Sequence, residues 1–225
     1  MLSKSRPIVH LVKTFIWLLK YLFERRKRIN GLKQRWQESE AEITLVSPFL
    51  NLDRPSLAEN RYQDIYWGSL PKVLCAEGKK INWLHQFIPD TNISSYDEAA
   101  RVLNRLNNWN DDGQTHAFVE SFLTPRIIKN AIRDFFRIQR PARRANNKFA
   151  TKQNEYRVLW PLFTKEFEAS SQGKIALENL LNVGLFEAAF SNLSQQKIGL
   201  YLLEKQPWGV ERIAAWQSQE NLKVV

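Results

Sequence analysis

Residues that could take part in acid–base chemistry lie at the ends of three short apolar segments. They are Asn51 and Asp53 after residues 43–50, His85 within residues 80–88, and Glu204 and Gln206 after residues 197–203. Parallel strands end at one edge of an open sheet, and such sheets bind ligands beyond that edge. If the three segments are parallel strands, a histidine and carboxylates meet in one crevice. There they could serve as a general base and bind hydroxyl groups.

Three aromatic residues near these segments could complete a binding site for a sugar or a base. Tyr66, Trp67 and Trp208 could stack on the apolar face of such a ligand if the fold brings them to the crevice. Each candidate also has a structural alternative. His85 could be a hydrogen-bonded histidine or a surface histidine, Glu204 a helix cap or an ion-pair partner, and the two tryptophans core residues.

Several chemistries lack the motif that they need. The sequence contains no G-x-G-x-x-G, G-x-x-x-x-G-K-[ST] or G-x-S-x-G, and it has only eight glycines in 225 residues, so a phosphate-cradling loop is not expected. One cysteine and three histidines leave no disulfide framework and no zinc-ligand spacing. Metal-dependent sugar or phosphoryl transfer lacks its usual carboxylates, because no Asp-x-Asp occurs. We therefore predict no metal site and no resident cofactor.

The order of the elements predicts an α/β fold with a parallel, Rossmann-like sheet. Polar loops are expected at residues 107–114 and 140–152. Helical patterns cover residues 66–75, 96–107, 118–138, 156–167, 171–190 and 208–217. We expect an α/β lobe over residues 42–225 with a helical insertion at about 115–195. A strand, a helix and then the start of an apolar run at Leu222 resemble a βαβ unit that is cut short. We therefore expect the N-terminal lobe of a longer protein.

Residues 1–41 form a basic, amphipathic segment ahead of this lobe. A segment of ten basic and three acidic residues precedes a nearly balanced body in a chain of net charge +10. Apolar residues recur at steps of three and four after Pro7, which predicts a helix. Its lysines exclude an uncharged membrane span, and the pattern suits a helix on an anionic membrane surface. Packing on the lobe and an arm that binds nucleic acid are the alternatives. The candidate membrane-binding or anion-binding residues are Lys13, Lys20, Arg25, Arg26, Lys27 and Arg28.

A second basic row lies within the predicted helical insertion. Its members follow one another at steps of 3, 4, 4 and 3, which places them on one face of a helix. They are Arg126, Lys129, Arg133, Arg137 and Arg140. Such a row could bind the phosphates of nucleic acid, of a nucleotide-linked donor or of a lipid diphosphate. A solvated helix face is the alternative.

A resemblance to known proteins rests on five segments, which are residues 43–53, 61–74, 81–90, 115–118 and 198–217. In this order they resemble a family of bacterial surface carbohydrate biosynthesis proteins, which are glycosyltransferase-like with two lobes (GT-B type). The most specific part is similar to a Glu-Asn-Gln-x-Trp-Glu pattern with a later Ala-Trp. The residues that match are Glu204, Gln206, Trp208, Ala215 and Trp216, whereas Lys205 and Gly209 depart from the pattern.

The resemblance implies the acceptor-side lobe of a membrane-associated glycosyltransferase, cytoplasmic and peripheral on the inner membrane. The acceptor would be a carbohydrate or a lipid-linked molecule, and a nucleotide-sugar donor would bind mainly on a missing C-terminal lobe, so this chain alone would be inactive. The base would be His85, His116, Asp53 or Glu204. A non-catalytic membrane-peripheral scaffold, or a decayed remnant, is an alternative function. A basic nucleic-acid-binding protein is a further one.

Overall fold

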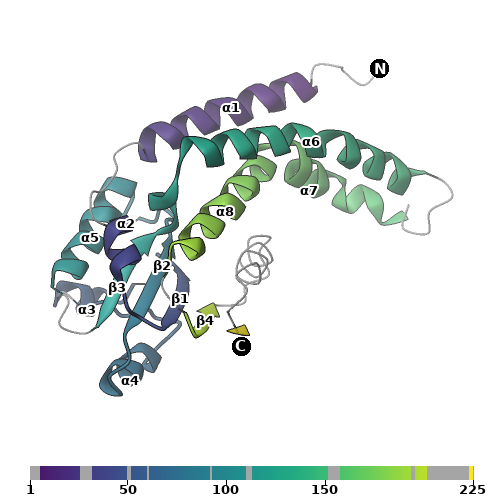
Figure 1. Ribbon diagram of the computed structural model, residues 1–225. Coiled ribbons are helices and arrows are strands. Elements are labelled where there is room, and N and C mark those ends of the chain that lie inside the picture. The colour runs from purple at the N-terminus through teal and green to yellow at the C-terminus, as the bar shows by residue number, and fades with distance from the viewer. Residues whose placement is uncertain are drawn as a thin grey trace. The chain divides into compact units, whose positions relative to one another are not determined.

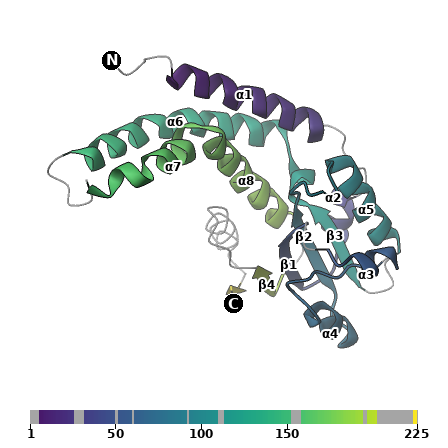
Figure 2. The same cartoon turned by 180° about the vertical axis from the view of Figure 1, so that it is seen from behind.

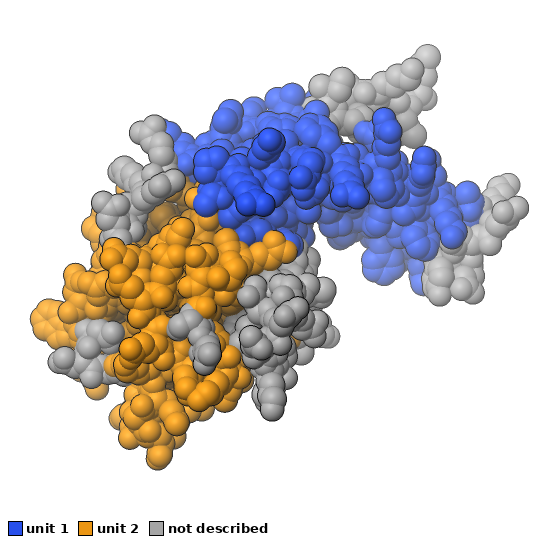
Figure 3. Space-filling model, viewed as in Figure 1, with its two compact units in different colours: residues 1–23, 124–184 blue, residues 24–123, 185–225 orange. Residues whose placement is uncertain are grey.

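The computed structural model describes residues 6–25, 32–49, 52–59, 61–91, 93–109, 113–151, 158–193, 196–201 and 223–224. The chain divides into two compact units, which Figure 3 draws in different colours. Unit 1 contains residues 1–23 and 124–184, and unit 2 contains residues 24–123 and 185–225. The N-terminal helix, which was predicted as a segment of its own, shares a unit with most of the predicted helical insertion.

Unit 2 is built around a parallel sheet (Figure 1). Its strands are β1 (Ile43–Pro48), β2 (Ile81–Gln86), β3 (Gln114–Phe118), β4 (Ile198–Tyr201) and the two-residue β5 (Lys223–Val224). They lie in the order β3-β2-β1-β4-β5, and every neighbouring pair is parallel. The chain thus moves outward from β1 first in one direction and then in the other, which is the order of a doubly wound sheet. The predicted α/β, Rossmann-like fold is confirmed.

The helices of unit 2 follow local signals in the sequence. They are α2 (Leu32–Glu38), α3 (Arg54–Ala58), α4 (Leu70–Ala76), α5 (Tyr96–Asn108) and the short 3₁₀ helix η1 (Val119–Phe122), with the end of α8 (Lys174–Ser191). Helix α5 begins as predicted, because the Ser95 hydroxyl accepts a hydrogen bond from the Glu98 backbone N–H at 3.3 Å. This bond satisfies one of the N–H groups that a helix start leaves without a partner. The acidic side chains in the first turn also complement the helix dipole.

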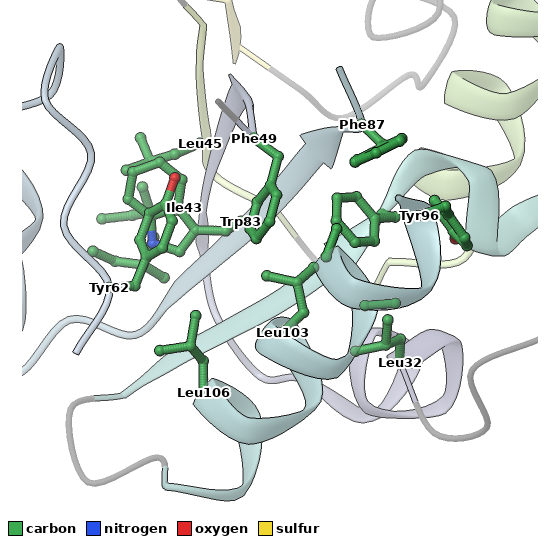
Figure 4. Close-up of a cluster of buried hydrophobic side chains, with 14 residues drawn as sticks. Leu32, Ile43, Leu45, Phe49, Tyr62, Trp83, Phe87, Tyr96, Leu103 and Leu106 are labelled. Carbon is green, nitrogen blue, oxygen red and sulfur yellow. The ribbon is translucent and has the colours of Figure 1, made fainter. Parts of the chain in front are cut away.

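A cluster of buried hydrophobic residues in unit 2 lies on one face of the sheet. Successive side chains of a strand point to opposite faces, and the register pairs Leu45 with Trp83 and Trp83 with His116, so these three share a face. Leu103 and Leu106 of α5 belong to the same buried cluster (Figure 4). Full burial of such a side chain stabilises the fold by about 1.5–3 kcal/mol.

Strand β3 differs from the prediction, which had a loop end and a helix begin in these residues. Gly113 precedes the strand with a φ of 73°, which glycine adopts without strain, and its carbonyl accepts a hydrogen bond from the Ile81 N–H at 3.0 Å. The Asn107 side chain bonds both the N–H and the C=O of His116, each at 2.8 Å. The segment is therefore a strand because of its neighbours, since its own five residues show no clear period.

Helix α6 (Pro125–Ala150) also differs from the prediction, because it continues through residues expected to form an exposed loop. Pro125 is the first residue of this helix, and the Thr124 hydroxyl accepts a hydrogen bond from the Ile127 N–H at 3.3 Å. Pro141 lies inside the helix and removes one backbone hydrogen bond. The last turns of α6 pack against α7 (Trp160–Gln172), whose Trp160 indole N–H donates a hydrogen bond to the Asn146 side-chain oxygen at 2.8 Å.

The elements that the structure describes in unit 1 are all helices. It contains α1 (Arg6–Arg25) up to residue 23, α6, α7 and the first part of α8. Figure 2 shows α1 running alongside α6 from behind, as Figure 1 does from the front. The two helices meet at aromatic rings, since the Phe15 centroid lies 6.4 Å from that of Phe135 and 6.1 Å from that of Phe136. Helices α6 and α8 approach closely at Gly184, where a Cβ would lie only 3.0 Å from Cγ2 of Ile127.

Candidate functional site

Two buried histidines from neighbouring strands form a pair in unit 2. Nε2 of His85 on β2 lies 3.1 Å from Nδ1 of His116 on β3, which is hydrogen-bond distance. The register sets Trp83 opposite His116 and His85 opposite Phe118, so both imidazoles lie on the core face of the sheet. Their exposed fractions are 0 % and 2 %. The structure therefore brings two of the candidate bases together and encloses them.

Aromatic rings surround the histidine pair. The Trp83 ring is stacked on both imidazoles, with interplanar angles of 4° and 7°, and the Tyr62 ring meets both edge-on at 5.0 and 4.8 Å. Burial lowers the pKa of His116 to about 3. Burial, assisted by the neighbouring imidazole, lowers the pKa of His85 well below its usual value. Both side chains are neutral at pH 7, but a general base must reach its substrate. The sequence offered His85 and His116 as separate candidate bases, and the structure places both imidazoles in the core.

A buried carboxylate, Asp64, lies in the loop that packs beside the histidine pair. Its Oδ2 accepts hydrogen bonds from the hydroxyls of Ser47 and, at 3.3 Å, Tyr62. Its Oδ1 accepts from the backbone N–H groups of Tyr66 and Trp67 at 2.8 and 3.2 Å. Burial raises the pKa of Asp64 in spite of these bonds. Asp64 thereby ties residues 61–69 to β1. Sequence reasoning missed it, although a lone acidic residue among aromatic residues was a signal.

A pocket of about 420 Å³ lies at the carboxyl ends of β1 and β2. Its walls come from the residues that follow each strand, from α3 and from one face of α5. They are Phe49, Leu52, Leu57, Ala58, Ile88, Asp90, Ile93, Glu98, Val102 and Arg105. This is the edge at which open α/β sheets bind ligands. A mainly apolar lining with a few polar groups is typical of small-molecule sites, and the volume is within their range of about 300–1,000 Å³.

Three polar side chains give the pocket its chemistry. Glu98, Val102 and Arg105 follow at steps of four and three, so α5 presents them on one face. Asp90 comes from the turn after β2, where its carboxylate also accepts a hydrogen bond from the Thr91 hydroxyl at 2.8 Å. The carboxylates can accept protons or hydroxyl hydrogen bonds, and the guanidinium can donate to oxygen atoms. The sequence predicted a site at this edge of the sheet but did not point to Glu98, Asp90 or Arg105 as its residues.

Phe49 connects the pocket to the histidine pair. It follows β1 directly and lines the pocket, while its ring meets the His85 imidazole edge-on at 5.2 Å. A ligand in the pocket would contact Phe49 and would not touch His85, because the imidazole is fully buried behind it. The pair can support the wall of the pocket but not the chemistry inside it.

The remaining sequence candidates of unit 2 have other roles or lie elsewhere. Asp53 caps α3, accepting from the N–H and hydroxyl of Ser56 at 3.0 and 2.6 Å, and these bonds lower the pKa of its carboxyl. Tyr66 is exposed. Trp67 is half-buried against the core, with its ring 6.5 Å from that of Trp83, as its structural alternative had it. The candidates outside the described residues are Asn51, Glu204, Gln206 and Trp208.

The basic residues of the N-terminal segment do not behave as one group. Lys13 and Lys20 are exposed on α1. Arg25, which was also predicted to bind a membrane or an anion, differs from them because its side chain is only 9 % exposed. Its guanidinium lies 5.2 Å from the ring centroids of both Phe87 and Tyr96, a cation–π arrangement. The candidates outside the described residues are Arg26, Lys27 and Arg28.

Three further observations bear on function. Among the described residues, no group of three or more His, Cys, Asp or Glu side chains could hold a metal ion. Of the helices that the structure describes, none has the length and apolarity needed to cross a membrane. Comparisons with protein-family models, with curated proteins and with solved structures found no match.

Proposed function

We propose that this chain is the acceptor-side lobe of a membrane-associated glycosyltransferase-like protein of bacterial surface polysaccharide biosynthesis. The observation that carries this proposal is the pocket at the carboxyl ends of β1 and β2. The resemblance of the sequence to a two-lobed transferase family adds to it. In such a protein the nucleotide-sugar donor binds mainly on the second lobe, and this lobe holds the sugar that accepts the transfer.

The lining of the pocket suits a sugar ring. Ile88, Ile93 and Val102 offer apolar surface to the C–H face of a sugar, and the polar groups offer partners for its hydroxyls. Glu98 or Asp90 would take the proton of the acceptor hydroxyl as that oxygen attacks the anomeric carbon of the donor sugar. The bond from that carbon to the nucleotide phosphate would break, and the nucleotide would leave with the electron pair. These carboxylates replace His85 and His116 as candidate bases, because they line the pocket and the imidazoles do not.

Saturation-transfer NMR on the full chain tests this proposal. The probes are free hexoses, N-acetylhexosamines, hexuronic acids and uridine diphosphate. We expect one sugar class to bind, Glu98→Gln to weaken it, and Val102→Trp to abolish it by filling the pocket. Arg101→Trp is the matched control, because Arg101 is exposed on the same helix and does not line the pocket. Absence of binding by every sugar would refute the proposal, as would equal binding by the two tryptophan variants.

A membrane-peripheral scaffold without transfer activity is a second candidate. The complete burial of the histidine pair favours it, because the residues best suited to base chemistry at pH 7 do not reach a substrate. Sugar binding that persists unchanged in Glu98→Gln and Asp90→Asn would support a scaffold, since a catalytic carboxylate is expected to contact the acceptor.

A further inference from the structure

Helix α1 exposes an apolar stripe on unit 1. Its buried residues, Thr14 and Leu18, lie on one side of the helix. The exposed apolar residues follow at steps of 3, 4, 3 and 4, which keeps them on a different face of the same helix. They are Val9, Val12, Ile16, Leu19 and Phe23. We name these five residues the α1 stripe.

The exposure of the α1 stripe is large for apolar side chains. Val12 is 52 % exposed, Ile16 61 % and Leu19 67 %. Apolar residues in water are common singly, but a continuous exposed patch marks a contact surface. The flanking lysines at 13 and 20 are also exposed. An apolar face bordered by lysine is the composition of helices that lie in the headgroup region of a bilayer.

Helix α6 adds a row of positive charge to the same unit. The five residues predicted to share a helix face are all exposed, and all five lie within α6. Asp134 is the one acidic residue in the sequence of α6, and it pairs with Arg133 at 3.1 Å. The row is Arg126, Lys129, Arg133, Arg137 and Arg140, and we name it the α6 row.

The aromatic contact between α1 and α6 joins the stripe to the row. Phe136 is half exposed, and its ring is stacked on that of Phe15 at 6.1 Å and 23°. On α1, the neighbours of Phe15 at i−3 and i+4 are Val12 and Leu19 of the stripe. On α6, Phe136 is spaced four residues from Arg140 of the row. Side chains at these spacings are neighbours on a helix surface, so the apolar and the basic surfaces approach each other across one seam.

We propose that the α1 stripe and the α6 row form a single surface that docks on an anionic lipid bilayer. The stripe enters the headgroup boundary, and the row lies against the phosphates of anionic lipids. The charge of the surface favours a bilayer over a protein partner or a second copy, because either of these would need an acidic surface to meet the row. The same surface of a second copy is not acidic, since α1 and α6 together carry only two acidic residues. The inference deepens the membrane-associated part of the proposed function and rests on it.

Co-sedimentation of the full chain with vesicles tests the proposal. One set of vesicles contains phosphatidylglycerol and phosphatidylcholine in equal parts, and the other contains phosphatidylcholine alone. We expect binding to the anionic set that weakens as salt rises, because the charges are exposed and screened. Each basic residue near an anionic surface contributes roughly 1 kcal/mol. A variant with Lys129→Gln, Arg137→Gln and Arg140→Gln should therefore bind about 100-fold more weakly.

Two further variants distinguish the effect of the proposed surface on vesicle binding from the effect of the net charge of the chain. Lys72→Gln, Lys79→Gln and Arg101→Gln make the same charge change on exposed residues of unit 2, and this control should retain vesicle binding within a few-fold. Val12→Ser, Ile16→Ser and Leu19→Ser keep all charges but should also weaken binding at least about 100-fold, because the apolar insertion is lost. The substituted side chains are exposed, and circular dichroism checks that the helices persist.

Several outcomes would overturn this surface. They are no binding to anionic vesicles, equal binding to both vesicle sets, and equal weakening by the α6-row variant and its unit 2 control. A fourth is a serine variant that abolishes self-association but leaves vesicle binding intact, which assigns the stripe to a second copy. A fifth is an α6-row variant that loses only RNA affinity, which assigns the row to nucleic acid. None of the substituted residues of α1 or α6 lines the pocket, so these variants should bind sugar as the wild type does. The membrane proposal can therefore fail while the sugar-binding proposal holds.

Discussion

Acid should destabilise unit 2 through the His85–His116 pair. In the folded chain burial keeps both imidazoles neutral, with the pKa of His116 at about 3 and that of His85 well below its usual value. In the unfolded chain a histidine binds a proton with a pKa of about 6.5. As pH falls below that value, the unfolded state takes up protons that the folded state does not. The contribution of the two neutral imidazoles to the free energy of unfolding is therefore fully present above about pH 6.5 and is lost as pH falls below it.

The size of the loss follows from this linkage. Between pH 7 and pH 5, each imidazole that stays neutral in the folded state removes about 2 kcal/mol from the free energy of unfolding. Two imidazoles remove about 4 kcal/mol, a large part of a typical total of about 5–15 kcal/mol. Asp64 acts in the opposite direction, because its raised pKa lets the folded state bind a proton at higher pH than the unfolded state. It reduces the loss as pH falls through its folded pKa.

Urea unfolding at pH 7, 6 and 5, followed by tryptophan fluorescence, measures this loss. Trp83 is stacked on both imidazoles and reports on their surroundings. His116→Phe keeps an aromatic ring at this position but removes one titrating group, so its loss from pH 7 to pH 5 should be about 2 kcal/mol. Leu103→Val is the matched control, because it lowers stability at every pH while both imidazoles remain. A wild-type free energy that does not fall, or a His116→Phe slope equal to that of the wild type, would refute the reasoning.

Three further predictions concern stability and are also measured by urea unfolding. Gly184→Ala gains up to about 1 kcal/mol of helix propensity but pushes on Cγ2 of Ile127 at a typical cost of about 1–3 kcal/mol. It should destabilise the wild type but not the Ile127→Ala variant, and equal effects in both would contradict the steric cause. Asn107→Ala removes both side-chain hydrogen bonds to the backbone of His116 and should lower the free energy of unfolding by about 1–3 kcal/mol. A loss of less than a few tenths of a kcal/mol would show that these two bonds do not stabilise β3. Ser95→Ala should cost about 1 kcal/mol through the lost cap of α5, whereas Ser95→Asp should retain most of the stability.

The local elements could be read from the sequence where their signal is contained within a few residues. The apolar runs at 43–50 and 80–88 contain β1 and β2, and Ser95 marks the start of α5. The alternation of strands and helices was enough to predict a parallel Rossmann-like sheet. It also predicted a site at the carboxyl edge of the sheet, and a pocket lined by other residues lies there. The predictions of the fold and of these elements succeed because capping, helical period and burial of a whole strand act at short range along the chain.

Contacts between distant segments decided the rest. Gln114–Phe118 is a strand only because it pairs with β2, and α6 continues past Pro141 with support from α7. Sequence showed that α1 has apolar residues at helical spacing, but not that Phe15 packs on α6 while Leu19 remains exposed. Likewise it identified His85 and His116 as chemically capable, and their separation of 31 residues concealed a 3.1 Å contact. Residue type limits what a side chain can do, but strand register and helix packing set its burial, and burial determines whether it meets a ligand, a membrane or the core.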